Sequence, residues 1–200
     1  MLIELRSDYL SAVLIAVAKH DIRYYLKGVF VEVNKEGVVY IVGTDGCRLN
    51  VAKQVMPTPP GEEASVIIPR DQVGNALKIT PKKRETILLD TEYNILGGIA
   101  FTPVEGQFPA WKKVLPSSEV EVTTEGVKDG SGVNFDYLSD ACKAVKICSS
   151  GVKLKGAWVR RIGESGMWVV QASNCEDFSA YIAPLRADGP PPPLSAQSEV

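Results

Sequence analysis

The feature that most constrains the fold is a pattern that recurs three times along the chain: one amphipathic helix set among several short strands. The first helix is predicted to run from Ser7, a suitable N-cap, to about residue 19. The other two are predicted over 71–79 and 135–147. The apolar stripe of the first helix, at positions i, i+3, i+4 and i+7, consists of Leu10, Val13, Leu14 and Val17. Such a stripe buries one face of its helix.

Short strand patterns, bounded by turn residues, accompany each helix. We expect strands over 1–5, 25–34, 37–43 and 48–54 in the first third, over 65–68, 85–90, 94–96 and 99–104 in the second, and over 120–124, 153–161, 167–171 and 178–183 in the last. The order β-α-β-β-β therefore occurs three times, which indicates an α+β fold with its helices on one face of antiparallel sheets. The pattern alone also fits an unrelated α+β domain with the same spacing.

The composition excludes several kinds of protein. Lys and Arg number 22 against 24 Asp and Glu, and the net charge of −2 excludes a strongly basic, histone-like nucleic-acid binder. His20 is the single histidine and the four cysteines form no Cys-x-x-Cys pair, so we expect neither a metal site nor a disulfide framework. The apolar run 10–18 is too short to cross a membrane. We therefore expect a cytoplasmic protein with reduced thiols and no signal peptide.

No group of residues has the spacing of a catalytic centre. The run Gly163-Glu164-Ser165-Gly166 is one residue short of a nucleophile elbow and is typical of a turn. Cys142 belongs to the apolar stripe of the third helix, so we expect it in the core rather than as a nucleophile. No Gly-rich run has the spacing of a phosphate-binding loop. We therefore expect neither enzyme activity nor a cofactor.

Four segments, in order and with about the right spacing, resemble the middle domain of the bacterial DNA polymerase III β subunit, the sliding clamp. They are Asp21-Ile22-Arg23-Tyr24-Tyr25-Leu26-Lys27-Gly28, Thr44-Asp45-Gly46-Cys47-Arg48-Leu49, Val66-Ile67-Ile68-Pro69-Arg70 and Phe108-Pro109-Ala110-Trp111-Lys112-Lys113-Val114-Leu115-Pro116. The segments 134–138 and 181–186 resemble the start of the final helix and the end of the last domain in that family.

The resemblance implies a reduced clamp. Residues 1–116 correspond to the middle domain, 117–186 to half of the last domain, and 187–200 to a flexible Pro-rich tail. The implied architecture is the DNA-clamp fold built from three β-α-β-β-β units, with helices facing a pore and sheets forming the outer shell. Because half a domain leaves a sheet uncovered, we expect a homo-oligomer, and a ring of twelve units would need four chains. Leu194 in the tail is a candidate for folding back onto the chain and competing with partners.

The resemblance also implies a function. A sliding clamp is a processivity factor that tethers polymerase or other replication proteins to double-stranded DNA without reading its sequence, which places it in the cytoplasm at the nucleoid. Its partners insert short peptides, from polymerases and clamp loaders, into a cleft. An alternative is a clamp-like peptide-binding adaptor or decoy that does not encircle DNA. The outward side of the first helix favours this alternative because it carries a single basic residue, Lys19.

Two sets of residues are carried over by position. The peptide-binding set is Arg23, Tyr25, Leu26, Thr44, Gly46, Cys47, Arg48, Leu49, Pro109, Lys113, Val114, Pro184, Leu185 and Arg186. The DNA-binding set is Lys19, His20, Tyr24, Lys82, Lys83, Lys143 and Lys146. In the first set the leucines and Val114 would supply apolar area, while Arg23 and Arg48 would orient polar groups of the peptide. Cys47 stands where the family has a histidine.

Overall fold

The computed structural model describes residues 1–81, 84–115, 131–149, 156–162 and 166–186. The first unit consists of β1 (Leu2–Arg6), α1 (Ser7–Leu14), the short 3-10 helix η1 (Tyr24–Leu26), β2 (Gly28–Val33), β3 (Val38–Thr44) and β4 (Arg48–Val55). The second consists of β5 (Ala64–Pro69), α2 (Arg70–Ile79), β6 (Thr86–Asp90), β7 (Ile95–Leu96) and β8 (Ile99–Ala100), and a 3-10 helix, η2 (Trp111–Val114), follows it. The third consists of β9 (Ser131–Gly132), α3 (Phe135–Cys148), β10 (Trp158–Ile162), β11 (Met167–Ala172), β12 (Cys175–Ile182) and β13 (Leu185–Arg186). The predicted β-α-β-β-β order is confirmed in the first two units, and in the third unit the predicted helix is followed by three strands as expected.

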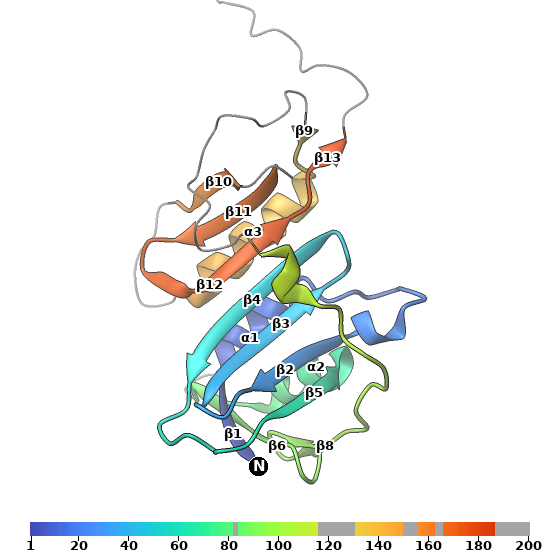
Figure 1. Ribbon diagram of the computed structural model, residues 1–200, viewed down its shortest axis with the longest axis vertical. Helices are drawn as coiled ribbons and strands as arrows, with labels where there is room; N and C mark the ends of the chain where they lie inside the picture. The colour runs from blue at the N-terminus through green and yellow to red at the C-terminus, as the bar shows by residue number, and fades with distance from the viewer. Residues whose placement is uncertain (82–83, 116–130, 150–155, 163–165, 187–200) are drawn as a thin grey trace, which may run out of the picture.

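The first two units exchange their leading strands. Strand β5 of the second unit pairs with β2 of the first, from Gly28↔Pro69 to Val33↔Ala64, and β1 of the first pairs with β6 of the second. The result is a seven-stranded sheet of order β10-β11-β12-β4-β3-β2-β5 and a four-stranded sheet of order β1-β6-β7-β8 (Figure 1). All the described pairings are antiparallel.

The third unit extends the sheet of the first unit. Strand β12 pairs with β4 in a five-residue register from Phe178↔Ala52 to Ile182↔Arg48. The ladder continues past the strand, because the amide of Ala183 donates to the carbonyl of Cys47 at 2.8 Å. The β12 edge of the third unit is therefore covered by the first unit.

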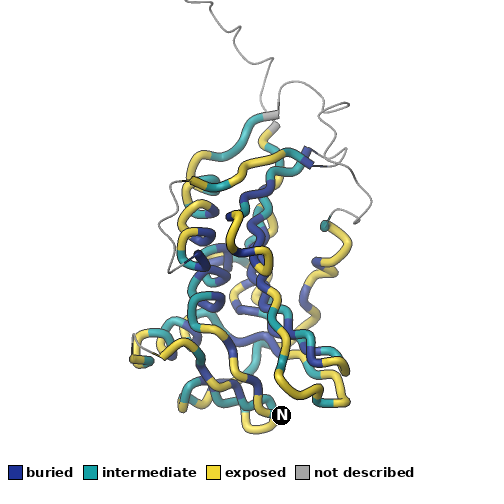
Figure 2. The backbone as a smooth tube through the Cα atoms, turned by 90° about the vertical axis from the view of Figure 1, so that its left-hand side faces the viewer, coloured by how far each residue is buried: buried dark blue, intermediate teal, exposed yellow. Residues whose placement is uncertain are grey.

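The three helices lie on one face of the large sheet, with α1 between α2 and α3 (Figure 1). Strand residues alternate between the two faces, as the period of a β-strand requires. In β3, Val39 and Ile41 join the core under the helices, whereas Tyr40 and Val42 join a second apolar cluster on the opposite face. Figure 2 shows buried residues concentrated where helices and sheet meet, and exposed residues in the peripheral loops.

Helix α1 ends at Leu14, not near residue 19, because groups far away in the sequence bind its last carbonyls. The buried amide of Asn50 donates to the carbonyl of Ala12 at 2.8 Å, and the Arg70 guanidinium donates to the carbonyls of Leu14 and Val17 at 2.6 and 2.7 Å. The predicted N-cap was also wrong: Arg6 occupies that position without a side-chain cap. By contrast, α3 begins where Asn134 accepts the amides of Asp136 and Tyr137.

Two other expectations need correction. Cys142 is exposed rather than in the core, and Cys148 is the buried cysteine of α3. The strand expected over 99–104 ends at Ala100, while β9 and β13 had not been predicted. The strand expected over 120–124, most of the turn at 163–166 and the tail from 187 lie outside the described residues.

Candidate functional site

The face of the large sheet opposite the helices is partly covered by the segment that follows β8. Phe108 stacks on Phe30 of β2 with ring centroids 4.6 Å apart, and Trp111 of η2 lies 5.2 Å from Tyr40 of β3. Both side chains belong to an apolar cluster that includes Leu49. These contacts anchor η2 on the sheet and leave a hollow between η2 and the end of β12.

This hollow is a cavity of about 640 Å³, a size typical of small-ligand and peptide sites. Twelve of the fourteen residues in the predicted peptide-binding set line it: Arg23, Tyr25, Leu26, Thr44, Gly46, Cys47, Arg48, Leu49, Pro109, Lys113, Val114 and Pro184. They come from η1, the turn between β3 and β4, η2 and the segment after β12. Leu185 lies on β13 outside the cavity, and the side chain of Arg186 is outside the described part.

Sequence reasoning missed seven lining residues: Ala110, Trp111, Leu115, Ile162, Met167, Tyr181 and Ala183. Five of them carried a usable signal. Ala110, Trp111 and Leu115 lie inside the clamp-like motif at 108–116, and Tyr181 and Ala183 lie inside the clamp-like segment 181–186. Tyr181 also alternates along β12 with Ala180 and Ile182, which face the core. Ile162 and Met167 carried none, because their position depends on the pairing of β12 with β4.

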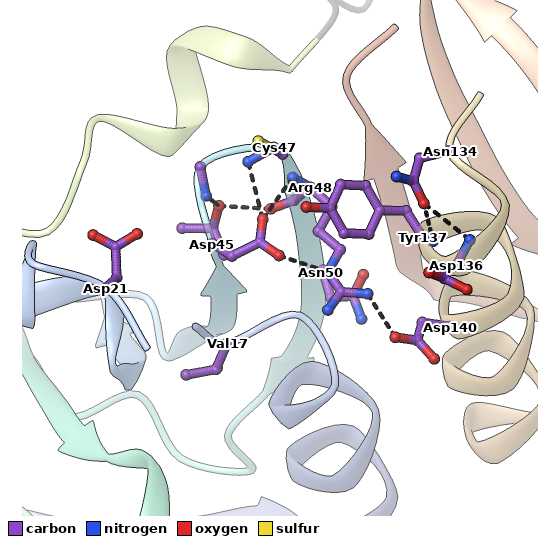
Figure 3. Close-up of polar contacts among 12 residues, drawn as sticks. Val17, Asp21, Asp45, Cys47, Arg48, Asn50, Asn134, Asp136, Tyr137 and Asp140 are labelled. Atoms are coloured by element: carbon purple, nitrogen blue, oxygen red, sulfur yellow. Dashed lines mark hydrogen bonds and ion pairs between the residues drawn. The ribbon is translucent and has the colours of Figure 1, made fainter. Parts of the chain in front are cut away.

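The turn between β3 and β4 is held by its own side chains (Figure 3). The Thr44 hydroxyl donates to the carbonyl of Arg48 at 2.6 Å and accepts the amide of Gly46 at 3.0 Å. The Asp45 carboxylate accepts the amides of Cys47 and Arg48 at 2.9 and 3.1 Å. Gly46 has φ +93°, a conformation that favours glycine. The rim of the cavity is therefore preformed at this turn.

Arg23 is held against this turn from the side of η1. Its guanidinium makes two hydrogen bonds to the Asp21 carboxylate, at 3.0 and 2.8 Å, and one to the carbonyl of Asp45 at 3.2 Å. A Cβ on Gly46 would lie 2.9 Å from that guanidinium, which is a second reason for glycine there. The hydrogen bonds from Arg23 lower the pKa of Asp21 to about 2, so this pair stays ionised at neutral pH.

Arg48 joins the first unit to the third. Its guanidinium donates to Asp45 at 2.9 Å and to Asp140 of α3 at 2.8 Å, and it lies 4.6 Å from the ring centre of Tyr137 (Figure 3). Only 14% of the side chain is exposed. The guanidinium is therefore engaged between β4 and α3, and Arg48 braces one wall of the cavity.

Comparison of the sequence with known protein families assigns the chain to one of them. The model of the DNA polymerase III beta subunit, central domain, matches residues 4–109, which is more than half of the chain. The chain belongs to the DNA polymerase III β subunit family. The match ends just before η2, so the third unit lies beyond it.

Curated relatives agree with that assignment. The beta sliding clamp of Pseudomonas aeruginosa is 34% identical over 171 residues, and that of Proteus mirabilis is 32% identical over 173. Each alignment covers 82% of this chain but 43% of the relative, so the chain spans less than half the length of these clamps. The beta sliding clamp of Treponema pallidum is 32% identical over 109 residues, which cover 52% of this chain and 29% of that clamp.

Solved structures show the same fold. The DNA polymerase III subunit beta of Pseudomonas aeruginosa aligns with a TM-score of 0.66 at 19% identity, over 93% of this chain and 66% of that one. A putative β subunit from Eubacterium rectale aligns with a TM-score of 0.68 at 14% identity, over 94% and 66%. The Helicobacter pylori beta clamp bound to a DNA ligase peptide aligns with a TM-score of 0.62 at 14% identity, over 92% and 65%. The predicted clamp fold is confirmed.

The ion pair between Arg48 and Asp140 should make the stability of the fold depend on pH. Burial alone raises the pKa of the Asp140 carboxyl, but hydrogen bonds from Arg48 and Lys143 outweigh it and lower the net pKa. An unfolded aspartate titrates near pH 4, so the contribution of Asp140 to stability is present above about pH 4 and is lost as the pH falls through its lower folded value. We expect the stability difference between the wild type and Asp140→Asn to be constant from pH 7 to about pH 5 and to shrink in stronger acid. Urea unfolding at each pH measures this difference, and one that persists unchanged into strong acid would contradict the assignment.

The residues expected to contact DNA are spread over the surface. Lys19 and His20 are exposed after α1, and Tyr24 on η1 is half-exposed. Lys143 and Lys146 are exposed on α3, and the ammonium of Lys143 binds Asp140 at 3.0 Å. Lys82 and Lys83 lie outside the described residues.

Within the described part of the chain, His, Cys, Asp and Glu side chains form no group of three that could hold a metal ion. No helix among the described residues is long and apolar enough to cross a membrane.

Proposed function

We propose that this protein is a reduced sliding-clamp homologue, a processivity factor that binds peptides of replication proteins in the cavity between its first and third units. The observation that carries the proposal is the lining of that cavity, where twelve residues chosen by their match to clamp motifs meet from four separate segments. On this proposal, residues 1–116 form a clamp domain, 117–186 form half of another, and 187–200 form a tail. The protein has no catalytic activity of its own and acts in the cytoplasm at the nucleoid.

The chemistry of the cavity fits an extended peptide with apolar anchors. Leu26, Leu49 and Trp111 form a buried apolar floor, which would take a leucine or aromatic side chain. Arg23 and Lys113 stand exposed on the rim, where they would meet the carbonyls or carboxylates of the peptide. The Helicobacter pylori clamp was solved with a DNA ligase peptide bound. We propose the same class of partner here, from polymerases and clamp loaders.

A labelled peptide tests this function. We expect the fluorescence anisotropy of a short peptide of the Gln/Leu/Phe type to rise on titration with the full chain and to saturate at one peptide per chain. Because the floor is apolar, the affinity should change little with salt. A scrambled peptide of the same composition is the control. Equal responses to the two peptides would contradict the proposal.

The second part of the proposal is that the clamp associates into an oligomer that surrounds double-stranded DNA without reading its sequence. The lysines on α3 and the exposed residues after α1 would contact phosphates. A closed assembly predicts a topological result: the protein stays on a nicked circular plasmid during gel filtration and is lost when the plasmid is linearised. Loss from both forms would exclude encirclement.

One observation favours a second candidate, a clamp-like adaptor or decoy that binds peptides without encircling DNA. The helix face carries acidic residues as well as basic ones: Asp8 on α1, Asp71 on α2 and Asp136 on α3. In addition, Lys143 is already paired with Asp140. An adaptor would bind the labelled peptide as described but would show no retention on the circular plasmid.

A further inference from the structure

The strand that follows the helix has the same role in the first two units. In the first unit this strand is β2, and β5, the leading strand of the second unit, pairs with it. In the second unit it is β6, and β1, the leading strand of the first unit, pairs with it. The two units thus complete each other by a reciprocal exchange, while α1 and α2 pack side by side.

In the part of the chain that the structure describes, the corresponding strand of the third unit has no such partner. The strand after α3 is β10, and it forms the end of the seven-stranded sheet, with β11 as its single neighbour among the described strands. The leading strand of this unit, β9, makes two residue pairs with β13 and leaves its other edge open in the part of the chain that the structure describes. Residues 116–130 connect η2 to β9, and this connection is much shorter than a β-α-β-β-β unit.

The lack of a second neighbouring strand beside β10, among the described strands, leaves its residue Val159 exposed. The helix-facing apolar residues of the equivalent strands are almost fully buried: Val31 of β2 is 1% exposed and Ile87 of β6 is 1% exposed. Val159 of β10 stands opposite Val170, which is 0% exposed, and therefore faces the same core, yet Val159 itself is 41% exposed. Trp158, its neighbour, is 63% exposed. Proteins normally protect an exposed apolar edge strand, either by pairing it with another strand or by covering it.

We propose that this edge is covered by the third unit of a second copy of the chain. Strand β9 of each copy pairs with β10 of the other, as β1 pairs with β6 and β5 with β2, and the two α3 helices lie side by side. The third unit is self-complementary, because it carries both an open edge strand, β10, and a leading strand, β9, that can pair with β10 of the other copy. A two-fold axis produces such an isologous interface. The inference uses the strand topology and does not depend on what the cavity binds.

The substitution Val159→Asp tests the interface in the full-length chain. The wild type should sediment as a dimer or a larger even-numbered assembly that dissociates on dilution. A carboxylate placed in this interface should raise the dissociation constant about tenfold or more, because the partner would bury it without a counter-charge. The control is Val55→Asp at the end of β4, where Val55 is 64% exposed and β10 is distant in the sheet order. This variant should associate like the wild type.

Peptide anisotropy on the same samples separates this inference from the proposed function, because a dissociated Val159→Asp chain should still bind the peptide. If that variant fails to fold, hydrogen exchange of the wild type decides, since protection of the β10 amides should rise with protein concentration. A wild type that stays monomeric, or a folded Val159→Asp that associates as tightly as the wild type, overturns the proposal. So does β10 protection that does not depend on concentration.

Discussion

Replacing Val114 with aspartate is expected to weaken binding of the labelled peptide about thirtyfold or more, a loss of roughly 2 kcal/mol. Val114 lies on η2 and lines the cavity, and 53% of it is exposed in the unliganded chain. A bound peptide would bury the new carboxylate against the apolar floor of the cavity. The carboxylate would then lose its hydration without gaining a counter-charge. Because the residue is at the surface before binding, the fold should be unaffected.

The matched control is Leu88→Asp. Leu88 is 47% exposed and lies on β6 in the four-stranded sheet, which contributes no residue to the cavity. It should bind the peptide with the wild-type affinity. Circular dichroism and urea unfolding of both variants confirm that neither change alters the fold. If Val114→Asp and Leu88→Asp bind equally well, the peptide does not occupy this cavity.

The second large effect is expected from Arg48→Met, which should lower the free energy of unfolding by about 2 kcal/mol or more. The substitution keeps the aliphatic volume but leaves the carboxylates of Asp45 and Asp140 without the guanidinium that bridges them. Arg48→Lys should restore only part of the loss, since an ammonium cannot reproduce the planar fork of arginine. Urea unfolding measures both, and hydrogen exchange should show that α3 loses protection first.

Arg23→Met is the matched control for that experiment. Arg23 also lines the cavity and also forms an ion pair, with Asp21, but its side chain is 47% exposed against 14% for Arg48. Water screens an exposed ion pair, which therefore contributes little to stability, so Arg23→Met should cost far less than Arg48→Met. Equal costs for the two variants would contradict the role of Arg48 as the link between β4 and α3.

Local sequence patterns were enough to predict most elements of the fold. Alternating residues such as Val39, Tyr40 and Ile41 define the two faces of β3, and the stripe on α3 defines its buried side. The motif containing Thr44, Asp45 and Gly46 predicted a turn, and the side-chain hydrogen bonds of Thr44 and Asp45 to its backbone are local. These features depend on neighbours within a few residues, and for that reason the sequence alone reveals them.

The features that were missed depend on distant contacts. Helix α1 ends early because Asn50 and Arg70 bind its carbonyls, and neither is near it in the sequence. The bond from Arg48 to Asp140 joins residues 92 positions apart. Cys142 matched the apolar spacing of α3, but its side chain lies at the exposed border of the stripe. Most of the cavity lining was predicted through the family motifs, since leucines such as Leu26 and Leu49 by themselves indicate only a core.

The central claim is that the cavity between η1, η2 and the end of β12 receives a partner peptide. The most direct measurement is the position of a bound peptide, mapped by a photoreactive phenylalanine at its apolar anchor and mass spectrometry of the crosslinked chain. We predict crosslinks confined to residues 23–26, 44–49, 109–115, 162, 167 and 181–184, which a scrambled peptide does not form. Crosslinks on the helix face formed by α1, α2 and α3, or the same crosslinks from the scrambled peptide, would contradict the claim.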